Sequence, residues 1–190
     1  LRDAATAFVN LGIRKIRLTG GEPLIRRDIL KLVESLARLD GLDELTMTTN
    51  GVKLPSMAQS LKDAGVSRLN ISIDSLKADR FKTLTRTGDL NQVMAGIQAA
   101  KNADFTKIKL NAVILAGFND DEVVDLAQYA VDNAMDISFI EEMPLGEISS
   151  HKRAETRVNS EQVRQRLAQK FTLLDSTETT GGPSRYLQVA

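Results

Sequence analysis

The sequence predicts an α/β fold, an incomplete TIM-like (β/α) barrel of parallel strands with helices on the outside. Two observations predict it. Five short β-type runs alternate with helical patterns, which is typical of βαβ units and a parallel sheet. Four successive runs also place apolar side chains on one face and polar side chains on the other, because neighbouring residues of a strand point to opposite sides.

The strand and helix patterns follow one another along the first three quarters of the chain. The β-type runs cover residues 14–20, 45–50, 68–74, 107–115 and 137–143. The helical patterns cover residues 1–12, 27–41, 56–65, 91–103 and 120–134. Asp28 is a suitable N-cap for the second helix, and Gly65 is a suitable stop for the third.

The end of the chain has a different character. Residues 144–160 are polar and predict a long loop, residues 160–171 predict an exposed helix, and residues 176–184 are rich in turn-forming types. Residues 185–190 predict an edge strand. We therefore divide the chain into a barrel core, 1–148, and the start of a C-terminal region, 149–190.

Composition limits the class of protein. The 190 residues suit one domain, and 25 basic residues balance 25 acidic ones, so no net charge attracts nucleic acid or a membrane surface. No apolar run approaches the roughly 20 residues of a membrane span. The absence of cysteine excludes disulfides and thiolate metal sites within these residues. We expect a cytoplasmic protein, and, since no methionine precedes the first helical pattern, a piece of a longer chain.

The polar strand faces select among parallel architectures. Ile16 and Leu18 share one face of the first run while Arg17 lies on the other, and the next three runs repeat this division. A doubly wound sheet buries both faces, and a closed eight-stranded barrel fills its interior with bulky apolar side chains. Polar faces favour a wide or incomplete barrel with a hydrated interior, into which Arg17 and Lys109 would point.

The sequence GGEP, residues 20–23, follows the first strand. Ligands of β/α proteins bind at the carboxyl ends of the strands, and glycines let a ligand approach the backbone closely. Exposed carbonyls and the Glu22 carboxylate at this edge would accept hydrogen bonds from an ammonium group. The motif therefore predicts a ligand site at the end of the first strand.

These segments together resemble one enzyme family. RKIRLTGGEPLIRRDI, TMTTNG, LNISIDSL, NQVMAGIQAA, KIKLNAVI and FIEEMPLGE occur in the order and spacing of the GTP 3′,8-cyclase family of radical S-adenosylmethionine (SAM) enzymes. The resemblance covers residues 1–148 and continues more weakly through GGPSRY. It implies a radical SAM barrel and conversion of GTP to (8S)-3′,8-cyclo-7,8-dihydroguanosine 5′-triphosphate in molybdenum cofactor biosynthesis.

The resemblance also implies roles for particular residues. Three positions match contacts with the substrate GTP: Arg17, Thr48 and Lys109. Three others match contacts with the cofactor SAM: Gly21, Ser72 and Met143. The resemblance implies no catalytic acid or base and no metal ligand among these residues. Arg17 and Lys109 fit their roles independently, because both lie on the predicted inner face and a triphosphate needs cations there.

The chain departs from the family in its cysteines. The family carries a CxxxCxxC motif ahead of the first helix and three further cysteines near the C-terminus, which hold two 4Fe–4S clusters in the full-length protein. None of these ligands is present here. Because thiolates hold such clusters, we expect these residues to ligate no cluster and to be inactive by themselves. The sequence leaves a homodimer open.

Three other functions remain open from the sequence. A peptide-modifying radical SAM enzyme would share GGEP but gives no reason for Arg17, Thr48 and Lys109. A β/α-barrel aldolase would use Lys109 to form a Schiff base. A non-enzymatic scaffold would bind neither SAM nor GTP.

Overall fold

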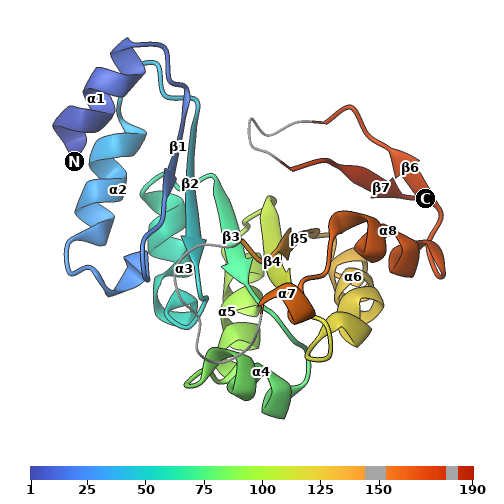
Figure 1. Cartoon of the computed structure of the whole chain (residues 1–190). Helices are drawn as coiled ribbons and strands as arrows, with labels where there is room; N and C mark the ends of the chain where they lie inside the picture. The colour runs from blue at the N-terminus through green and yellow to red at the C-terminus, as the bar shows by residue number, and fades with distance from the viewer. Residues whose placement is uncertain (144–152, 179–183) are drawn as a thin grey trace. The chain divides into compact units, whose positions relative to one another are not determined.

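A computed structural model describes residues 1–143, 153–178 and 184–190 (Figure 1). It confirms the predicted α/β fold with parallel strands: a five-stranded sheet has the order β1-β2-β3-β4-β5. Its strands are β1 Lys15–Leu18, β2 Glu44–Thr49, β3 Arg68–Ser72, β4 Ile108–Ile114 and β5 Asp136–Glu141. All five correspond to predicted strands. The strands of the described residues do not close into a barrel.

Helices and short single-turn segments connect these strands. The α-helices are α1 Arg2–Asn10, α2 Ile29–Ala37, α3 Leu54–Asp63, α4 Ala78–Thr85, α5 Leu90–Asn102, α6 Val123–Asp132, α7 Arg153–Thr156 and α8 Ser160–Ala168. Two 3-10 turns are η1 Pro23–Ile25 and η2 Asp120–Glu122. The sequence patterns did not predict α4, and α7 lies in the segment predicted as a loop.

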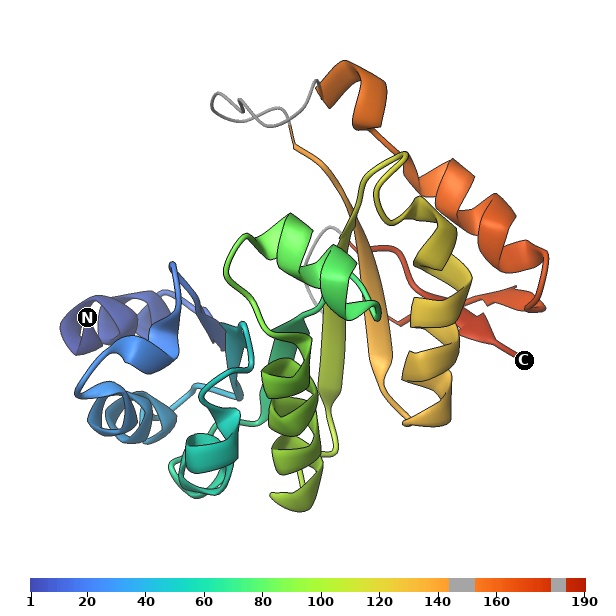
Figure 2. The same ribbon diagram turned by 90° about the horizontal axis from the view of Figure 1, so that it is seen from below.

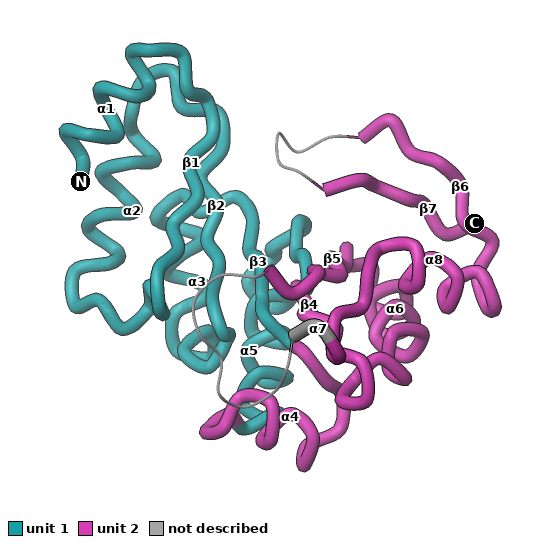
Figure 3. Tube along the Cα trace, in the orientation of Figure 1, with its two compact units in different colours: residues 1–73, 89–110 teal, residues 74–88, 111–190 magenta. Residues whose placement is uncertain are grey.

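The chain forms two compact units (Figure 3). Unit 1 comprises residues 1–73 and 89–110, and unit 2 comprises residues 74–88 and 111–190. The predicted boundary at residue 148 lies outside the described residues.

Unit 1 is built on the parallel strands β1, β2 and β3. Its register pairs Arg17 with Thr46 and Thr48 with Asn70. Figure 2 shows the helices of this unit, coloured blue to green, along one side of its strands. The apolar strand faces supply buried core residues, as the alternation predicted. They include Leu45, Met47, Leu69, Ile71, Ile108 and Leu110.

Two helix ends in unit 1 test the predicted signals. Gly65 follows the C-cap of α3 with a φ of +108°, a backbone conformation that favours glycine, so it stops the helix as predicted. Asp28 occupies the N-cap position of α2, but its carboxylate does not cap the helix. It instead pairs with the Arg26 guanidinium, 2.7 Å from Nε, which lowers the pKa of Asp28.

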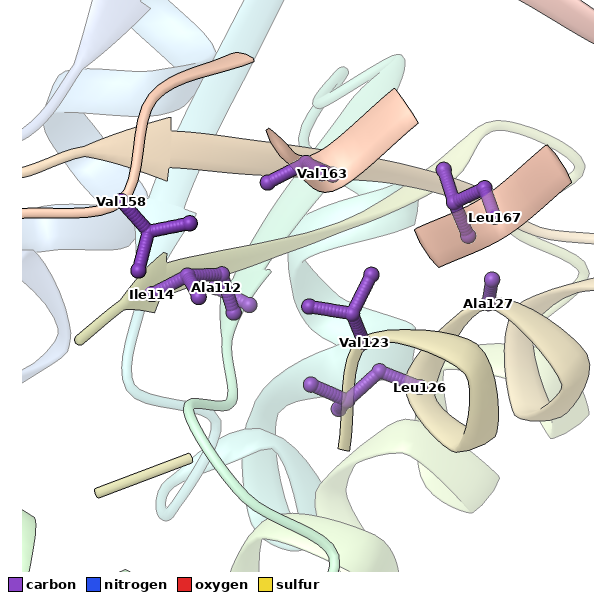
Figure 4. Packing of buried hydrophobic residues seen from close by; sticks show 8 residues of the cluster. All are labelled: Ala112, Ile114, Val123, Leu126, Ala127, Val158, Val163 and Leu167. Atoms are coloured by element: carbon purple, nitrogen blue, oxygen red, sulfur yellow. The ribbon is translucent and has the colours of Figure 1, made fainter. Parts of the chain in front are cut away.

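Unit 2 has its own apolar core (Figure 4). Strand β4, helix α6, helix α8 and the residue Val158 before α8 contribute its buried side chains, which are Ala112, Ile114, Val123, Leu126, Ala127, Val158, Val163 and Leu167. A separate antiparallel hairpin joins β6 Leu173–Asp175 to β7 Leu187–Val189. The strand predicted near the C-terminus is therefore present as β7, while its partner β6 was not predicted.

A search of the described residues for a helix both long and apolar enough to span a membrane finds none.

Candidate functional site

The polar face of unit 1 carries four of the predicted ligand residues. Side chains of paired residues in neighbouring strands point to the same side of a sheet, so the pairing of Thr48 with Asn70 places both on one face. Ser72 lies two residues beyond Asn70 and shares its face. Arg17 occupies this face of β1, and Lys109 the corresponding face of β4.

These residues differ in their access to water. Arg17 is exposed, Thr48 and Ser72 are partly buried, and Lys109 is only 6% exposed. The polar face is therefore less exposed to water at Lys109 than the alternation predicted. An ammonium group at this depth attracts a negative ligand more strongly than it would in water, since the effective dielectric constant is lower.

The charges at the start of the strands are internally paired. The Glu44 carboxylate forms ion pairs with Lys15 at 3.5 Å and with Arg68 at 3.4 Å. Arg17, one row further along, differs: within the described parts of the chain, no hydrogen bond or ion pair involves its guanidinium. The polar face therefore has paired charges at the amino ends of the strands, where one carboxylate lies between two cations, and an unpaired cation nearer their carboxyl ends.

The GGEP loop is held by its own glutamate. The Glu22 carboxylate accepts from the Thr49 hydroxyl at 2.7 Å, from the Asn50 amide at 2.7 Å and from the Leu24 amide at 3.0 Å. These bonds tie the loop after β1 to the end of β2. Glu22 was expected to meet an ammonium ligand, but three internal donors already use its carboxylate.

The two glycines are the open part of this motif. Gly20 has a φ of +147°, which other residue types rarely adopt, so the backbone conformation explains why residue 20 is glycine. Gly21 is exposed, and a methyl group built on it would meet no atom within 4 Å. The backbone at Gly21 is therefore open to solvent.

Met143 belongs to unit 2. It follows β5 and its side chain is 63% exposed. A methionine with this exposure is not the core residue that its type usually indicates.

Sequence reasoning missed two features of unit 1. Thr49 and the Asn50 amide hold Glu22, although nothing in the sequence links positions so far apart. Asn70 is 3% exposed and its Oδ1 atom has no hydrogen-bond partner. The residue type could have drawn attention to Asn70, because asparagine is uncommon within strands.

The residues present fit one of the two implied cofactors. The sequence contains no cysteine, and no three histidine, aspartate or glutamate side chains among the described residues gather closely enough to hold a metal ion. These residues therefore do not fit an iron–sulfur cluster. The open backbone at Gly21 and the partly buried Ser72, which carries a hydroxyl, do fit a polar cofactor such as SAM.

The chain is similar to a known protein family and to curated proteins. Residues 1–130 match the family model described as the Radical SAM superfamily. Along all 190 residues, the chain is 60% identical to a GTP 3′,8-cyclase of Pseudomonas putida and 59% identical to that of Pseudomonas entomophila. The chain spans 57% of the length of each.

A solved structure shares the fold. It is described as native anSMEcpe with bound AdoMet and Cp18Cys peptide, and matches with a TM-score of 0.66 at 14% identity. The match covers 90% of this chain and 50% of that one. At this identity the likeness shows the fold alone.

Proposed function

Because the chain belongs to the radical SAM superfamily, we propose that it is the central part of a GTP 3′,8-cyclase. The complete enzyme would convert GTP to (8S)-3′,8-cyclo-7,8-dihydroguanosine 5′-triphosphate in molybdenum cofactor biosynthesis. The identity of 60% over all 190 residues carries this proposal. In it, residues 1–148 form the barrel core, residues 149–190 begin the C-terminal region, and the enzyme works in the cytoplasm.

Arg17, Thr48 and Lys109 bind the substrate in this proposal. The triphosphate of GTP carries several negative charges, and the unpaired Arg17 guanidinium and the buried Lys109 ammonium complement them. Charge-assisted hydrogen bonds to phosphate are stronger than hydrogen bonds between neutral groups. The Thr48 hydroxyl either donates or accepts, so it suits a polar group of the nucleotide.

Gly21, Ser72 and Met143 bind SAM in this proposal. Gly21 leaves its backbone open to the cofactor, and Ser72 offers a hydroxyl. When bound beside a reduced cluster, SAM supplies the radical chemistry of the superfamily. The residues of this chain bind and orient the two small molecules, and none of them acts as an acid or base. The Gly21→Ala variant should keep its unfolding midpoint, since its methyl meets no atom within 4 Å, and should bind SAM more weakly.

The clusters must come from outside these residues. Two 4Fe–4S clusters serve the complete enzyme, and neither has a thiolate ligand here. We expect the chain to remain colourless after incubation with iron and sulfide under reducing conditions. Cluster absorbance at full strength would contradict this expectation.

A binding experiment tests the substrate assignment. Calorimetric titration of the chain with GTP should give binding that Lys109→Met weakens by about 10- to 100-fold, since a hydrogen bond to a charged group contributes about 1.5–3 kcal/mol. Lys107 is the matched control, because it immediately precedes β4, two residues before Lys109, and is exposed. Lys107→Met should bind GTP like the unmutated chain. Equal affinities of the two variants would refute the assignment.

The same titration separates the rival functions. A peptide that binds more tightly than GTP would favour a peptide-modifying radical SAM enzyme. Covalent trapping of a carbonyl substrate on Lys109 by borohydride would favour an aldolase.

A further inference from the structure

One buried polar group in unit 1 lacks a partner. Asn70 is 3% exposed, and its Oδ1 atom makes no hydrogen bond. Elsewhere in the described residues, the only other buried side-chain atom without a partner is Nη1 of Arg166, whose Nη2 already binds Asp120. Buried polar groups in proteins are normally paired, so each exception requires an explanation.

A second asparagine shows how a buried side-chain amide with a structural role forms its hydrogen bonds in this protein. Asn119, in unit 2, is completely buried. Its Oδ1 accepts from the Leu115 amide at 2.8 Å, and its Nδ2 donates to the carbonyls of Asp74 at 2.7 Å and Val113 at 2.8 Å. Asn119 therefore cross-links backbone segments. The side-chain oxygen of Asn70 makes no such link.

Asn70 lies between two residues that are proposed to bind GTP, one on each neighbouring strand. On one side, its register partner on β2 is Thr48. On the other side, the Leu69 amide donates to the Lys107 carbonyl at 3.2 Å. In a parallel pair this bond sets residue 69 opposite residue 108, so Asn70 lies beside Lys109 on the same face. The unpaired oxygen is thus in the middle of a row of Thr48, Asn70 and Lys109.

The chemistry of the row indicates what Asn70 meets. An amide oxygen only accepts hydrogen bonds, and so do the oxygens of a triphosphate, so the two do not match. The cation of Lys109 matches phosphate. The hydroxyls of a ribose and the N–H groups of a base are donors, and they match the Asn70 oxygen.

We propose that Asn70 is a further ligand-binding residue whose amide oxygen accepts a hydrogen bond from a hydroxyl or N–H group of a bound nucleoside. This inference rests on the proposed function and extends it. It divides the row into a phosphate-binding position at Lys109 and a nucleoside-binding position at Asn70. Both GTP and SAM contain a nucleoside, so the experiment compares the two.

The experiment measures affinity and stability in the same variants. Asn70→Leu keeps the branched shape of the side chain and removes the acceptor. We expect it to weaken GTP or SAM binding about three- to tenfold, the effect of one lost hydrogen bond. The weakened ligand identifies the source of the nucleoside. Inorganic triphosphate should bind Asn70→Leu and the unmutated chain equally, because it has no nucleoside.

Stability distinguishes a binding role from a structural one. Replacing an unpaired buried polar group by an apolar group of similar shape is nearly neutral or stabilising. The urea midpoint of Asn70→Leu should therefore equal or exceed that of the unmutated chain. Asn119→Leu is the matched control, and its midpoint should fall because three backbone groups lose their partner.

Any one of three results would overturn the assignment of Asn70 and leave the proposed function standing. They are unchanged affinity for both GTP and SAM in Asn70→Leu, an equal loss of affinity for inorganic triphosphate, and a midpoint that falls as far as that of Asn119→Leu. An unmutated chain that binds neither GTP nor SAM would instead overturn the proposed function, and this assignment with it.

Discussion

Replacing Gly96 by alanine tests how α5 packs against the end of β2. Gly96 is buried in the middle of α5, where its Cα faces the backbone of Gly51. A methyl group at residue 96 would overlap the Gly51 carbonyl oxygen and lie 3.0 Å from the carbonyl carbon. Gly51 itself has a φ of +82° and little space, since a methyl on it would lie 3.1 Å from Ile71. The atoms that the new methyl group would meet therefore belong to backbone that is itself closely packed.

Two opposing effects set the magnitude. Alanine is a better helix former than glycine by about 1 kcal/mol in a helix interior. Overpacking a core costs about 1–3 kcal/mol, and we take the upper end because the overlap involves backbone atoms rather than a flexible side chain. The difference is a destabilisation of about 2 kcal/mol. For a chain of this size, this corresponds to a fall in Tm of about 4–8 °C.

Urea and thermal unfolding of the chain measure this difference. Ala95→Gly is the matched control, because Ala95 is the exposed neighbour in the same helix and reports helix propensity alone. Ala95→Gly should lower stability by about 1 kcal/mol. If propensity governed residue 96, Gly96→Ala would raise stability by a similar amount. A higher midpoint for Gly96→Ala would therefore refute the packing argument.

Three further predictions concern unit 1 and unit 2 separately. Thr49→Val keeps the side-chain shape but removes the hydroxyl that donates to Glu22 at 2.7 Å; urea unfolding should show a loss of about 2 kcal/mol, whereas Thr49→Ser should retain most of the stability. Gly65→Ala should lower the thermal midpoint, because its φ is +108° and its methyl would lie 2.5 Å from a neighbouring side chain; an unchanged midpoint would contradict this. Hydrogen bonds from the Ser160 hydroxyl and amide lower the pKa of Glu141 from 4.5 to about 2. The Glu141 carboxylate therefore stabilises the fold above about pH 4.5, and this stabilisation should disappear as the pH falls toward 2; a difference between the unmutated chain and Glu141→Gln that does not shrink over this range would contradict the assignment.

Much of the candidate site could be predicted from the strand faces. Strand alternation alone places Arg17, Thr48, Ser72 and Lys109 on polar faces, because the period of two is a property of the extended backbone. The end of α3 at Gly65 could also be predicted, since few other residue types adopt a positive φ. The roles of these residues in binding GTP and SAM came from the resemblance to a family and remain proposals.

The partners of polar groups could not be predicted in this way. Glu22 and Thr49 are 27 residues apart, and which donor reaches the carboxylate depends on how the GGEP loop meets the end of β2. Asn70 illustrates the same limit, because whether a buried amide is satisfied depends on every neighbouring strand. Helix α4 and strand β6 were missed for a related reason, as short segments carry weak periodicity and are stabilised by their tertiary contacts.

The amino-acid sequence by itself determined the order of the five parallel strands, the polar side of four of them and the glycine that ends α3. These follow from periodicity and local backbone sterics, which act between residues close in the chain. Only the tertiary structure decided that Glu22 is held by Thr49 and the Asn50 amide, that Gly96 rests on Gly51, and that the Asn70 oxygen has no partner. Hydrogen bonds and packing depend on distances of a few ångströms between residues far apart in the chain, and folding sets those distances.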